Sequence, residues 1–411
     1  MPAMTTTTAS ALALPATAPA AARAVLRQLG ALRIGHLSLQ LPDGTQARFG
    51  SDADAQPRAT IRLADWHVFG ATLKSGDIGF AESYIAGHWT TPDLPALLQL
   101  LLANRDAIES VIYGTWWGSL AYRVRHLLNR NSRQGSRKNI HAHYDIGNPF
   151  YRLWLDETMN YSSALFDGDL ARPTADAQAA KMRRALDECA LRPGQRLLEI
   201  GCGWGAVAET AARDFGARVT GLTLSDEQLG FANERLARAG LAAQAELRLQ
   251  DWRDCADGPF DAIVSIEMFE AVGREYWGRF FAMLRHKLAP GGRACIQSIT
   301  IRDDLFERYV RSTDFIQQYI FPGGLLPSAS AFRAEAREAG LEIVGERAFG
   351  ADYAETLRRW RTRFLAREAE VRGLGFDTRF VRIWEFYLAY CQAAFATGNT
   401  DVVQFTLRRP R

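Results

Sequence analysis

Three glycines follow a short apolar segment, in a place where the backbone could come very close to a ligand. The segment LLEIGCGWG, residues 197–205, puts Gly201, Gly203 and Gly205 at alternate positions. Glycine lacks a Cβ atom, so it permits a tight turn and a close approach by a bound molecule. A dinucleotide site favours the spacing G-x-G-x-x-G around a pyrophosphate, whereas this loop is G-x-G-x-G and follows Glu199. A carboxylate at this position repels phosphate and suits the ammonium group of an amino acid.

Two further strand ends carry side chains that could bind the same ligand. Thr223 and Gln228 follow one predicted strand, and Asp251 and Trp252 follow the next. Ser225 is expected to cap a helix, with Gln228 completing a capping box. Gln228 could also bind ribose hydroxyls. Asp251 could accept from an adenine amino group, unless it is a solvated loop residue, and Trp252 could stack on the ring. Strand ends of an open α/β sheet meet at one crevice, and the whole pattern resembles a class I S-adenosylmethionine (SAM) methyltransferase.

The elements that must position these residues alternate between strand and helix. We predict strands over 196–200, 217–222, 245–249, 260–266 and 294–300, with helices over 206–215, 225–239 and 276–288. This alternation predicts an α/β, Rossmann-like catalytic domain over 141–411 with a mostly parallel sheet. A smaller α+β domain is expected over 23–126, with a hairpin over 36–49, a strand over 59–68 and a helix over 92–104. Residues 1–22 are expected to form a flexible tail and 127–140 a basic linker.

Composition restricts the protein to a few classes. The chain has 411 residues and a net charge of +3, with 49 basic and 46 acidic residues, which argues against a protein that coats polyanions. Its five cysteines lack CxxC spacing, so we expect no metal centre or disulfide framework. No apolar run is long enough to span a membrane, and residues 1–22 do not read as a secretory signal. The expected location is the cytoplasm.

Several long motifs resemble the cyclopropane fatty acid synthase family, in collinear order over about residues 30–400. They include HYDIGN (143–148), MNYSSALF (159–166), EMFEAVG (267–273), FIQQYIFPGG (315–324), FGADY (349–353) and RIWEFYLAYC (382–391). The resemblance also reaches the N-terminal part, through GDIGFAESY (76–84) and GHW (87–89). It implies an enzyme that acts on cis-unsaturated acyl chains of membrane phospholipids, with SAM as the donor of one carbon.

The chemistry of such an enzyme sets clear demands. An alkene is a weak nucleophile, so the carbon donor must be a sulfonium, and its transfer leaves a carbocation in an apolar pocket. That cation requires nearby negative charge or π density, and a base must remove a proton. In this family a bound bicarbonate is thought to be the base. The resemblance implies a bicarbonate shell formed by Ser163, Glu270, Gln297 and Tyr353.

Two positions of that shell depart from the family pattern. Ser163 and Gln297 stand where members commonly carry cysteine and histidine. Both still donate hydrogen bonds, but a neutral glutamine cannot carry positive charge as histidine can. A methyl- or methylene-branched product is therefore an alternative to a cyclopropane ring. Glu270 is the main catalytic candidate, unless it only favours a helix start, and Glu267 could share its helical face.

The remaining candidates are supported by the resemblance alone. Tyr161 and Ser162 match contacts to the carboxylate of SAM. Cys391 matches a suspected functional cysteine, although a core thiol in an aromatic helix explains it better. His143 is explained equally well as a helix-terminus residue. Tyr353 could instead be an ordinary packed tyrosine.

A basic, tryptophan-containing segment could bring the protein to lipid. Residues 110–144 contain no acidic residue. The basic and tryptophan side chains of this window are Arg123, Arg125, Arg130, Arg133, Arg137, Lys138, Trp116 and Trp117. Tryptophan favours the headgroup boundary and arginine favours anionic lipid, so we expect peripheral binding to the inner leaflet; a solvated interdomain helix is an equal alternative. Lacking a recognised reader motif, the segment is not expected to bind nucleic acid.

Three other readings of the sequence remain. An N-methyltransferase of a small amine or a lipid headgroup would need no acyl channel. A SAM- or lipid-binding protein without turnover would be favoured by loss of Glu270, which is present. An NAD dehydrogenase is disfavoured by the glycine spacing and by the lack of a ribose-binding acid. Whether the chain forms a homodimer is left open.

Overall fold

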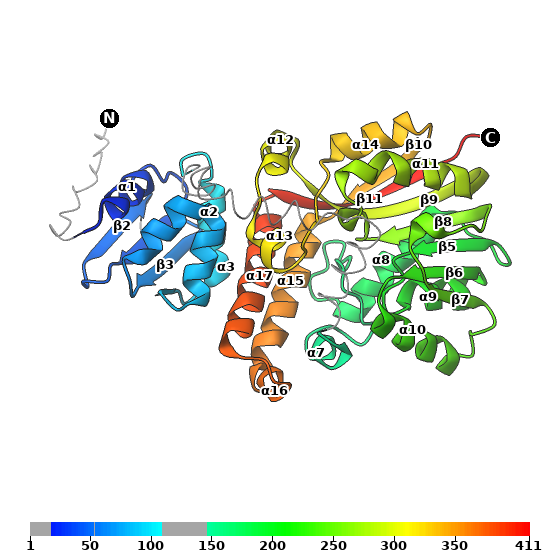
Figure 1. Ribbon diagram of the computed structural model, residues 1–411, viewed down its shortest axis with the longest axis horizontal. Helices are drawn as coiled ribbons and strands as arrows, with labels where there is room; N and C mark the ends of the chain where they lie inside the picture. Colours follow the sequence, from blue (N-terminus) through cyan, green and yellow to red (C-terminus); the bar gives the residue numbers. More distant parts are fainter. Residues whose placement is uncertain (1–17, 53, 109–145) are drawn as a thin grey trace.

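The N-terminal part of the protein is a small α+β unit. The computed structural model describes residues 18–52, 54–108 and 146–411. Its first sheet has four strands in the order β2-β1-β3-β4, drawn in blue in Figure 1. The strands are β1 (His36–Gln40), β2 (Gln46–Gly50), β3 (Arg58–Leu63) and β4 (Trp89–Thr90). The helices are α1 (Ala20–Leu29), α2 (His67–Ile85) and α3 (Leu94–Ala103).

The predicted hairpin is present. Strands β1 and β2 pair antiparallel, and between them the Asp43 side chain accepts from the backbone of Thr45 at 3.0 Å, while Gly44 has a φ of 88°. Leu37 and Leu39, at alternate positions of β1, are both about 2% exposed. Alternation in a strand sends every second side chain into the core.

Two predicted boundaries in this unit are wrong. Residues 20–22 were assigned to the flexible tail, but α1 begins at Ala20 and Ala22 is fully buried, because alanine suits both a helix and a close packing contact. The strand expected over 59–68 ends at Leu63, and α2 begins at His67. The linker expected over 127–140 lies outside the described residues.

The catalytic part contains the predicted, mostly parallel sheet. Its seven strands have the order β10-β11-β9-β8-β5-β6-β7. The parallel strands are β5 (Arg196–Ile200), β6 (Arg218–Thr223), β7 (Ala245–Leu249), β8 (Phe260–Ile266) and β9 (Leu288–Ile301). Strand β9 begins six residues before its predicted start and includes the Pro290-Gly291-Gly292 turn that was expected to precede it.

Helices cover both faces of this sheet (Figure 1). They include α8 (Thr174–Glu188), α9 (Ala206–Phe215), α10 (Asp226–Arg238), α11 (Trp277–Lys287) and α14 (Ala329–Glu338). Neighbouring residues of β5 enter different cores: Leu197 packs with the α8 and α9 side, and Leu198 packs with the α11 and α14 side. Burial of a strand on both faces is typical of a parallel sheet between two layers of helices, the sheet that the alternation of strands and helices predicted.

Two strands at one edge were not predicted. Strand β11 (Thr400–Arg408) pairs antiparallel with β9 on one side and with β10 (Glu342–Ala348) on the other. The chain between β9 and β10 begins with α12 (Asp303–Arg311) and α13 (Phe315–Tyr319). Between β10 and β11 lie α15 (Gly350–Ala366), α16 (Glu368–Gly373) and α17 (Thr378–Ala396). Helices α15 and α17 stand between the two parts of the molecule in Figure 1, where α17 packs against α3.

Among the described residues, no helix combines the length and the apolar character that crossing a membrane requires.

Candidate active site

The glycine loop has the backbone geometry that the sequence predicts. Gly201, Gly203 and Gly205 have φ values of 84°, 50° and 82°, a region that favours glycine. Gly201 and Gly203 line a cavity of about 310 Å³. Gly205 does not line it: a Cβ atom there would lie 2.8 Å from the Cβ of Ala232 on α10. The third glycine therefore serves the close packing of two helices.

A buried carboxylate, that of Glu199, lines the cavity next to this loop. Glu199, at the end of β5, is 3% exposed and lines the cavity. Its Oε2 atom has no hydrogen-bond partner within the described part of the chain. Burial raises the pKa of Glu199 well above its usual range, and Lys181 opposes that shift. An unpartnered carboxylate oxygen and a side-chain-free loop fit the amino-acid end of SAM, whose ammonium would supply the missing donor.

The predicted nucleoside contacts are only partly placed at the cavity. Gln228 and Trp252 line it, as does Thr223, whose hydroxyl donates to Gln228 Oε1 at 2.9 Å. Ser225 caps α10 by accepting from the backbone of Gln228 at 3.3 Å. The capping box is incomplete, because the Gln228 side chain is engaged by Thr223. Asp251 is absent from the lining, and its carboxylate holds the guanidinium of Arg253 at 2.6 Å and 2.8 Å.

Glu267 lines the cavity and accepts a network of hydrogen bonds. Its Oε1 atom accepts from the backbone N–H of Ser163 at 2.9 Å and from Gln297 Nε2 at 2.7 Å. Its Oε2 atom accepts from the Tyr353 hydroxyl at 2.6 Å. Three of the four residues predicted to surround bicarbonate therefore surround Glu267. Glu267 also has a φ of 50°, a strained backbone that is often found at active sites.

Glu270 lies beside this network on the short 3-10 turn Phe269–Ala271. Its Oε1 atom accepts from the backbone of Ile299 and from the Ser298 hydroxyl at 3.1 Å. Its Oε2 atom has no partner among the described residues. Glu270 and Glu267 are exposed only in part, and both line the cavity. Enclosure by protein and the neighbouring charge of Glu267 raise the pKa of Glu270 to about 8.

These contacts leave no shell for bicarbonate. Glu267 already uses the backbone of Ser163 and the side chains of Gln297 and Tyr353. The Ser163 hydroxyl is not free for an anion either, since it donates to the carbonyl of Ala164 at 3.0 Å. A second anion beside the charged Glu267 carboxylate would be repelled. The site does not fit a bound bicarbonate.

A fully buried lysine, which the sequence analysis did not predict, contacts Ser162 of the cavity lining. Lys181, on α8, has no exposed surface, and its Nζ atom donates to the Ser162 hydroxyl at 2.6 Å. Burial lowers the pKa of Lys181 to about 8, while Glu267 and other carboxylates oppose that shift. The available signal was its position in the buried stripe of α8, beside Gln178 and Met182. Charged residues are rarely buried without a partner, so a lysine in that stripe indicates acids nearby.

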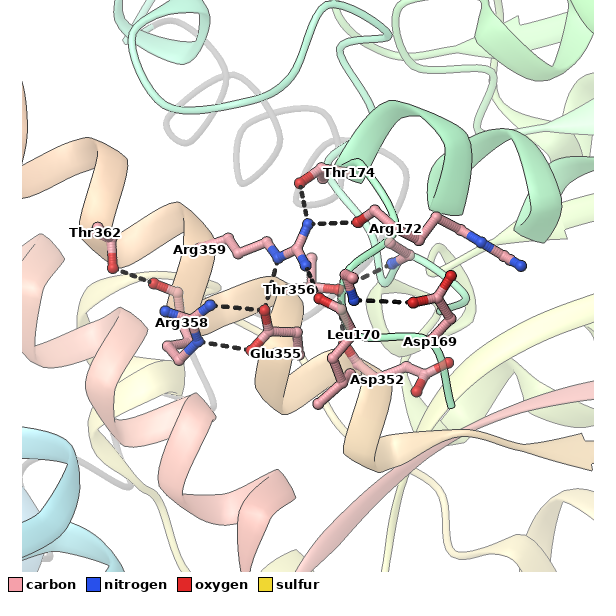
Figure 2. Close-up of polar contacts among 12 residues, drawn as sticks. Asp169, Leu170, Arg172, Thr174, Asp352, Glu355, Thr356, Arg358, Arg359 and Thr362 are labelled. Carbon is pink, nitrogen blue, oxygen red and sulfur yellow. Dashed lines mark hydrogen bonds and ion pairs between the residues drawn. The ribbon is translucent and has the colours of Figure 1, made fainter. Parts of the chain in front are cut away.

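Helix α15 holds the segment that carries Tyr161, Ser162 and Ser163. Thr356 accepts from the backbone of Ala164 at 3.1 Å, and Asp352 accepts from that of Phe166 at 2.7 Å. Arg359 extends the clamp by donating to the carbonyls of Leu170 and Arg172 at 2.7 Å and 2.8 Å, as Figure 2 shows.

Part of the cavity lining is aromatic. Tyr387, Tyr390 and Cys391 of α17 line the cavity together with Phe321. Tyr161 also lines it, and its hydroxyl is 2.7 Å from that of Tyr387. Burial raises the pKa of Cys391 far above its usual range, so its thiol stays protonated. His143 lies outside the described residues.

Comparisons with known proteins agree with this geometry. The model of the mycolic acid cyclopropane synthetase family matches residues 131–405. A tuberculostearic acid methyltransferase of Mycobacterium tuberculosis is 40% identical over 399 residues, which cover 95% of this chain and 92% of that protein. A cyclopropane-fatty-acyl-phospholipid synthase of Escherichia coli K12 is 33% identical over 364 residues, or 88% of this chain and 91% of that protein.

A solved structure supports the same conclusion. A mycolic acid cyclopropane synthase in complex with S-adenosylhomocysteine and CTAB has a TM-score of 0.62 and 32% identity, and the match covers 66% of this chain and 98% of that one. The predicted fold and the predicted family are both confirmed. The chain is a SAM-dependent methyltransferase, and it belongs to the mycolic acid cyclopropane synthetase family.

Proposed function

We propose that the enzyme transfers one carbon from SAM to a double bond in an unsaturated acyl chain of a membrane phospholipid. The observation that carries the proposal is a single cavity with two kinds of lining. The glycine loop and Glu199 form one part of the lining, and aromatic side chains, including Phe321 and Tyr387, form another. Two carboxylates, Glu267 and Glu270, lie in the same wall.

The two parts of the lining have different roles in this proposal. Bound SAM supplies a methyl group on a positively charged sulfur. The glycine loop, Glu199 and Trp252 hold and orient that molecule. The aromatic rings of Tyr387 and Phe321 exclude water from the alkene and present π density to positive charge. The Glu267 carboxylate adds a fixed negative charge, which stabilises a cation strongly in a site closed to water.

The proton acceptor in this proposal is Glu267. Three hydrogen bonds and the nearby cation of Lys181 favour its ionised form, although burial opposes it. Glu270 has a pKa of about 8 and is mostly protonated at neutral pH, which suits it less as a base. The Tyr353 hydroxyl, 2.6 Å from Glu267 Oε2, orients the carboxylate.

We infer a methylene-branched product. The alkene gains a methyl group, a hydride moves from the methylated carbon to the neighbouring cation, and Glu267 removes a proton from the methyl group to form a new C=C bond. Loss of the same proton without hydride migration closes a cyclopropane ring instead. Two observations favour the branch: Glu267 uses the donors expected for a ring-closing bicarbonate, and the relative that is 40% identical is named a methyltransferase.

We also propose that the enzyme works peripherally on the inner, anionic leaflet. The support is the sequence of residues 110–144, which carries arginine, lysine and tryptophan without any acid. Flotation with phosphatidylglycerol vesicles should recover the protein at low salt and release it at high salt. Equal recovery with neutral phosphatidylcholine vesicles would contradict this proposal.

The main experiment uses labelled SAM and mixed vesicles of oleoyl phosphatidylglycerol and oleoyl phosphatidylethanolamine, with the labelled product identified by mass spectrometry. Both products add one CH₂, but only the branched one retains an alkene that ozone cleaves. A saturated, ring-containing chain would overturn the inferred branch and keep the carbon transfer. Label on an amine, with none on acyl chains, would overturn the proposal in favour of N-methylation.

A further inference from the structure

A second cavity lies in the N-terminal domain. Its volume is about 100 Å³. It is enclosed by aliphatic side chains of the first sheet and of helix α3, with Leu39 on β1, Ile61 on β3 and Leu98 on α3. All three side chains belong to the buried core. Apolar cavities of this order stay free of water and accept apolar guests.

This cavity and the active-site cavity share one side chain among the described residues. Tyr390, on α17, lines both cavities. Its hydroxyl donates to Asp77 Oδ2 on α2 at 3.0 Å, and the same oxygen accepts from the backbone of Phe315 on α13 at 3.3 Å. The Tyr390 side chain therefore lies at the boundary between the two domains, with an apolar space on one side and the active-site cavity on the other.

The walls of the second cavity select its occupant. Among the described residues that line it, the polar side chains are Thr72, Asp77 and Tyr390. The Thr72 hydroxyl donates to the carbonyl of Val68 at 2.7 Å, and Asp77 and Tyr390 bond each other. The described lining therefore offers no polar group that is left to orient a headgroup, a sugar or an ion, so hydrocarbon is the chemistry that it matches.

We propose that the N-terminal cavity receives the methyl end of the acyl chain whose double bond lies in the active site, with Tyr390 as the side chain that the chain must pass. The N-terminal domain then measures the number of carbons beyond the double bond. This inference rests on the proposed function, because it assigns the substrate of that same site a second contact.

The test compares two substrates that differ only beyond the double bond. Oleoyl phosphatidylglycerol has a longer methyl end than myristoleoyl phosphatidylglycerol, and both carry the double bond at the same distance from the ester. The variants Leu39→Phe and Leu98→Phe place a larger side chain in the cavity, one from β1 and the other from α3. We expect the ratio of kcat/KM for oleoyl over myristoleoyl chains to fall about tenfold in each, the equivalent of two methylene groups that lose burial.

A matched control and a direct observation complete the design. Ile34→Phe adds the same kind of ring in the same domain at a side chain that is 47% exposed, and should leave the ratio unchanged. The thermal midpoints of Leu39→Phe and Leu98→Phe show whether the two variants are folded. An unchanged ratio in both folded variants would overturn the inference. An equal loss on both substrates would overturn it too, since that result reports damage to the site and not chain length.

Crystals of the wild-type enzyme with phosphatidylglycerol that carries an oleoyl chain brominated at its terminal carbon provide a readout without turnover. We expect the anomalous bromine peak between Leu39 and Leu98. A peak confined to the active-site side of Tyr390 would rule the inference out. If the wild-type enzyme modifies neither substrate while bromine still lies in the N-terminal cavity, the proposed function fails and the binding site stands.

Discussion

Replacement of Glu267 by glutamine separates its structural role from its chemical role. Glutamine has the same shape, so its carbonyl oxygen can keep the bonds from the Ser163 backbone and from Gln297 Nε2, which measure 2.9 Å and 2.7 Å. Its amide then faces the Tyr353 hydroxyl, which can rotate and accept instead of donating. All three partners stay satisfied, and only the negative charge is lost.

The expected cost in stability is small and the cost in activity is large. Hydrogen bonds to a charged group contribute about 1.5–3 kcal/mol and neutral ones about half as much. A neutral amide also avoids the burial penalty that raises the pKa of Glu267. We therefore expect Glu267→Gln to lower the free energy of unfolding by about 1–2 kcal/mol at most. Loss of a general base lowers kcat by about 10²–10⁴-fold.

The assay measures three quantities on one preparation: turnover of oleoyl phosphatidylglycerol, SAM affinity by calorimetry and the thermal midpoint. Glu275→Gln, the same change at an exposed residue eight positions away, is the control. We expect SAM binding within about threefold of wild type and turnover lowered at least about a hundredfold. Turnover within tenfold of wild type would refute the assignment of Glu267 as the base.

The same site offers a chemical rescue. Glycine accepts the φ of 50° at residue 267, so Glu267→Gly should fold and expose the donors of Ser163, Gln297 and Tyr353 to a small anion. Formate or bicarbonate should then restore part of the turnover, while chloride should not. The wild-type enzyme should be indifferent to removal of bicarbonate from the buffer. A wild-type enzyme that requires bicarbonate would contradict our reading of the network.

Three further predictions concern Glu270, Lys181 and Gly205. Folding raises the pKa of Glu270 from 4.5 to about 8, so the folded protein binds this proton more tightly than the unfolded chain, and the stability of the wild type falls as pH rises across this range. The thermal midpoint of Glu270→Gln should therefore rise relative to that of the wild type between pH 5 and pH 9. A constant difference between the two midpoints would show that Glu270 does not titrate there. Lys181→Met removes the buried cation that favours ionised Glu267, which should move the acidic limb of the pH–rate profile to higher pH, whereas a uniform loss at all pH values would indicate a packing role only. Gly205→Ala would place a Cβ atom 2.8 Å from Ala232 on a residue with a φ of 82°. This substitution should lower the free energy of unfolding by about 1–3 kcal/mol. An unchanged urea midpoint would contradict the packing role of this glycine.

Local patterns predicted most of the catalytic sheet, and they failed where distant segments decide. Strands β5, β7 and β8 have their predicted bounds, because each is a short segment with apolar side chains that lies between turn or loop residues. Strands β10 and β11 lie at the antiparallel edge, where β10 alternates between partly buried and exposed residues. Their pairing partners are fixed by the return of the chain after α14 and α17, which no local signal shows.

The site divides in the same way. The amino-acid sequence by itself determined the glycine loop, the carboxylate that precedes it and the family, since these depend on residue types at fixed short spacings. Only the tertiary structure decided which carboxylate stands at the centre. Glu267 collects donors from Ser163, Gln297 and Tyr353, which lie 104, 30 and 86 positions away along the chain, and it shares its surroundings with the buried Lys181. Hydrogen bonds join atoms that are close in space, and spacing along the chain does not show which atoms these are. The same three donor residues could surround a bicarbonate or a glutamate, and only the fold shows that they reach Glu267.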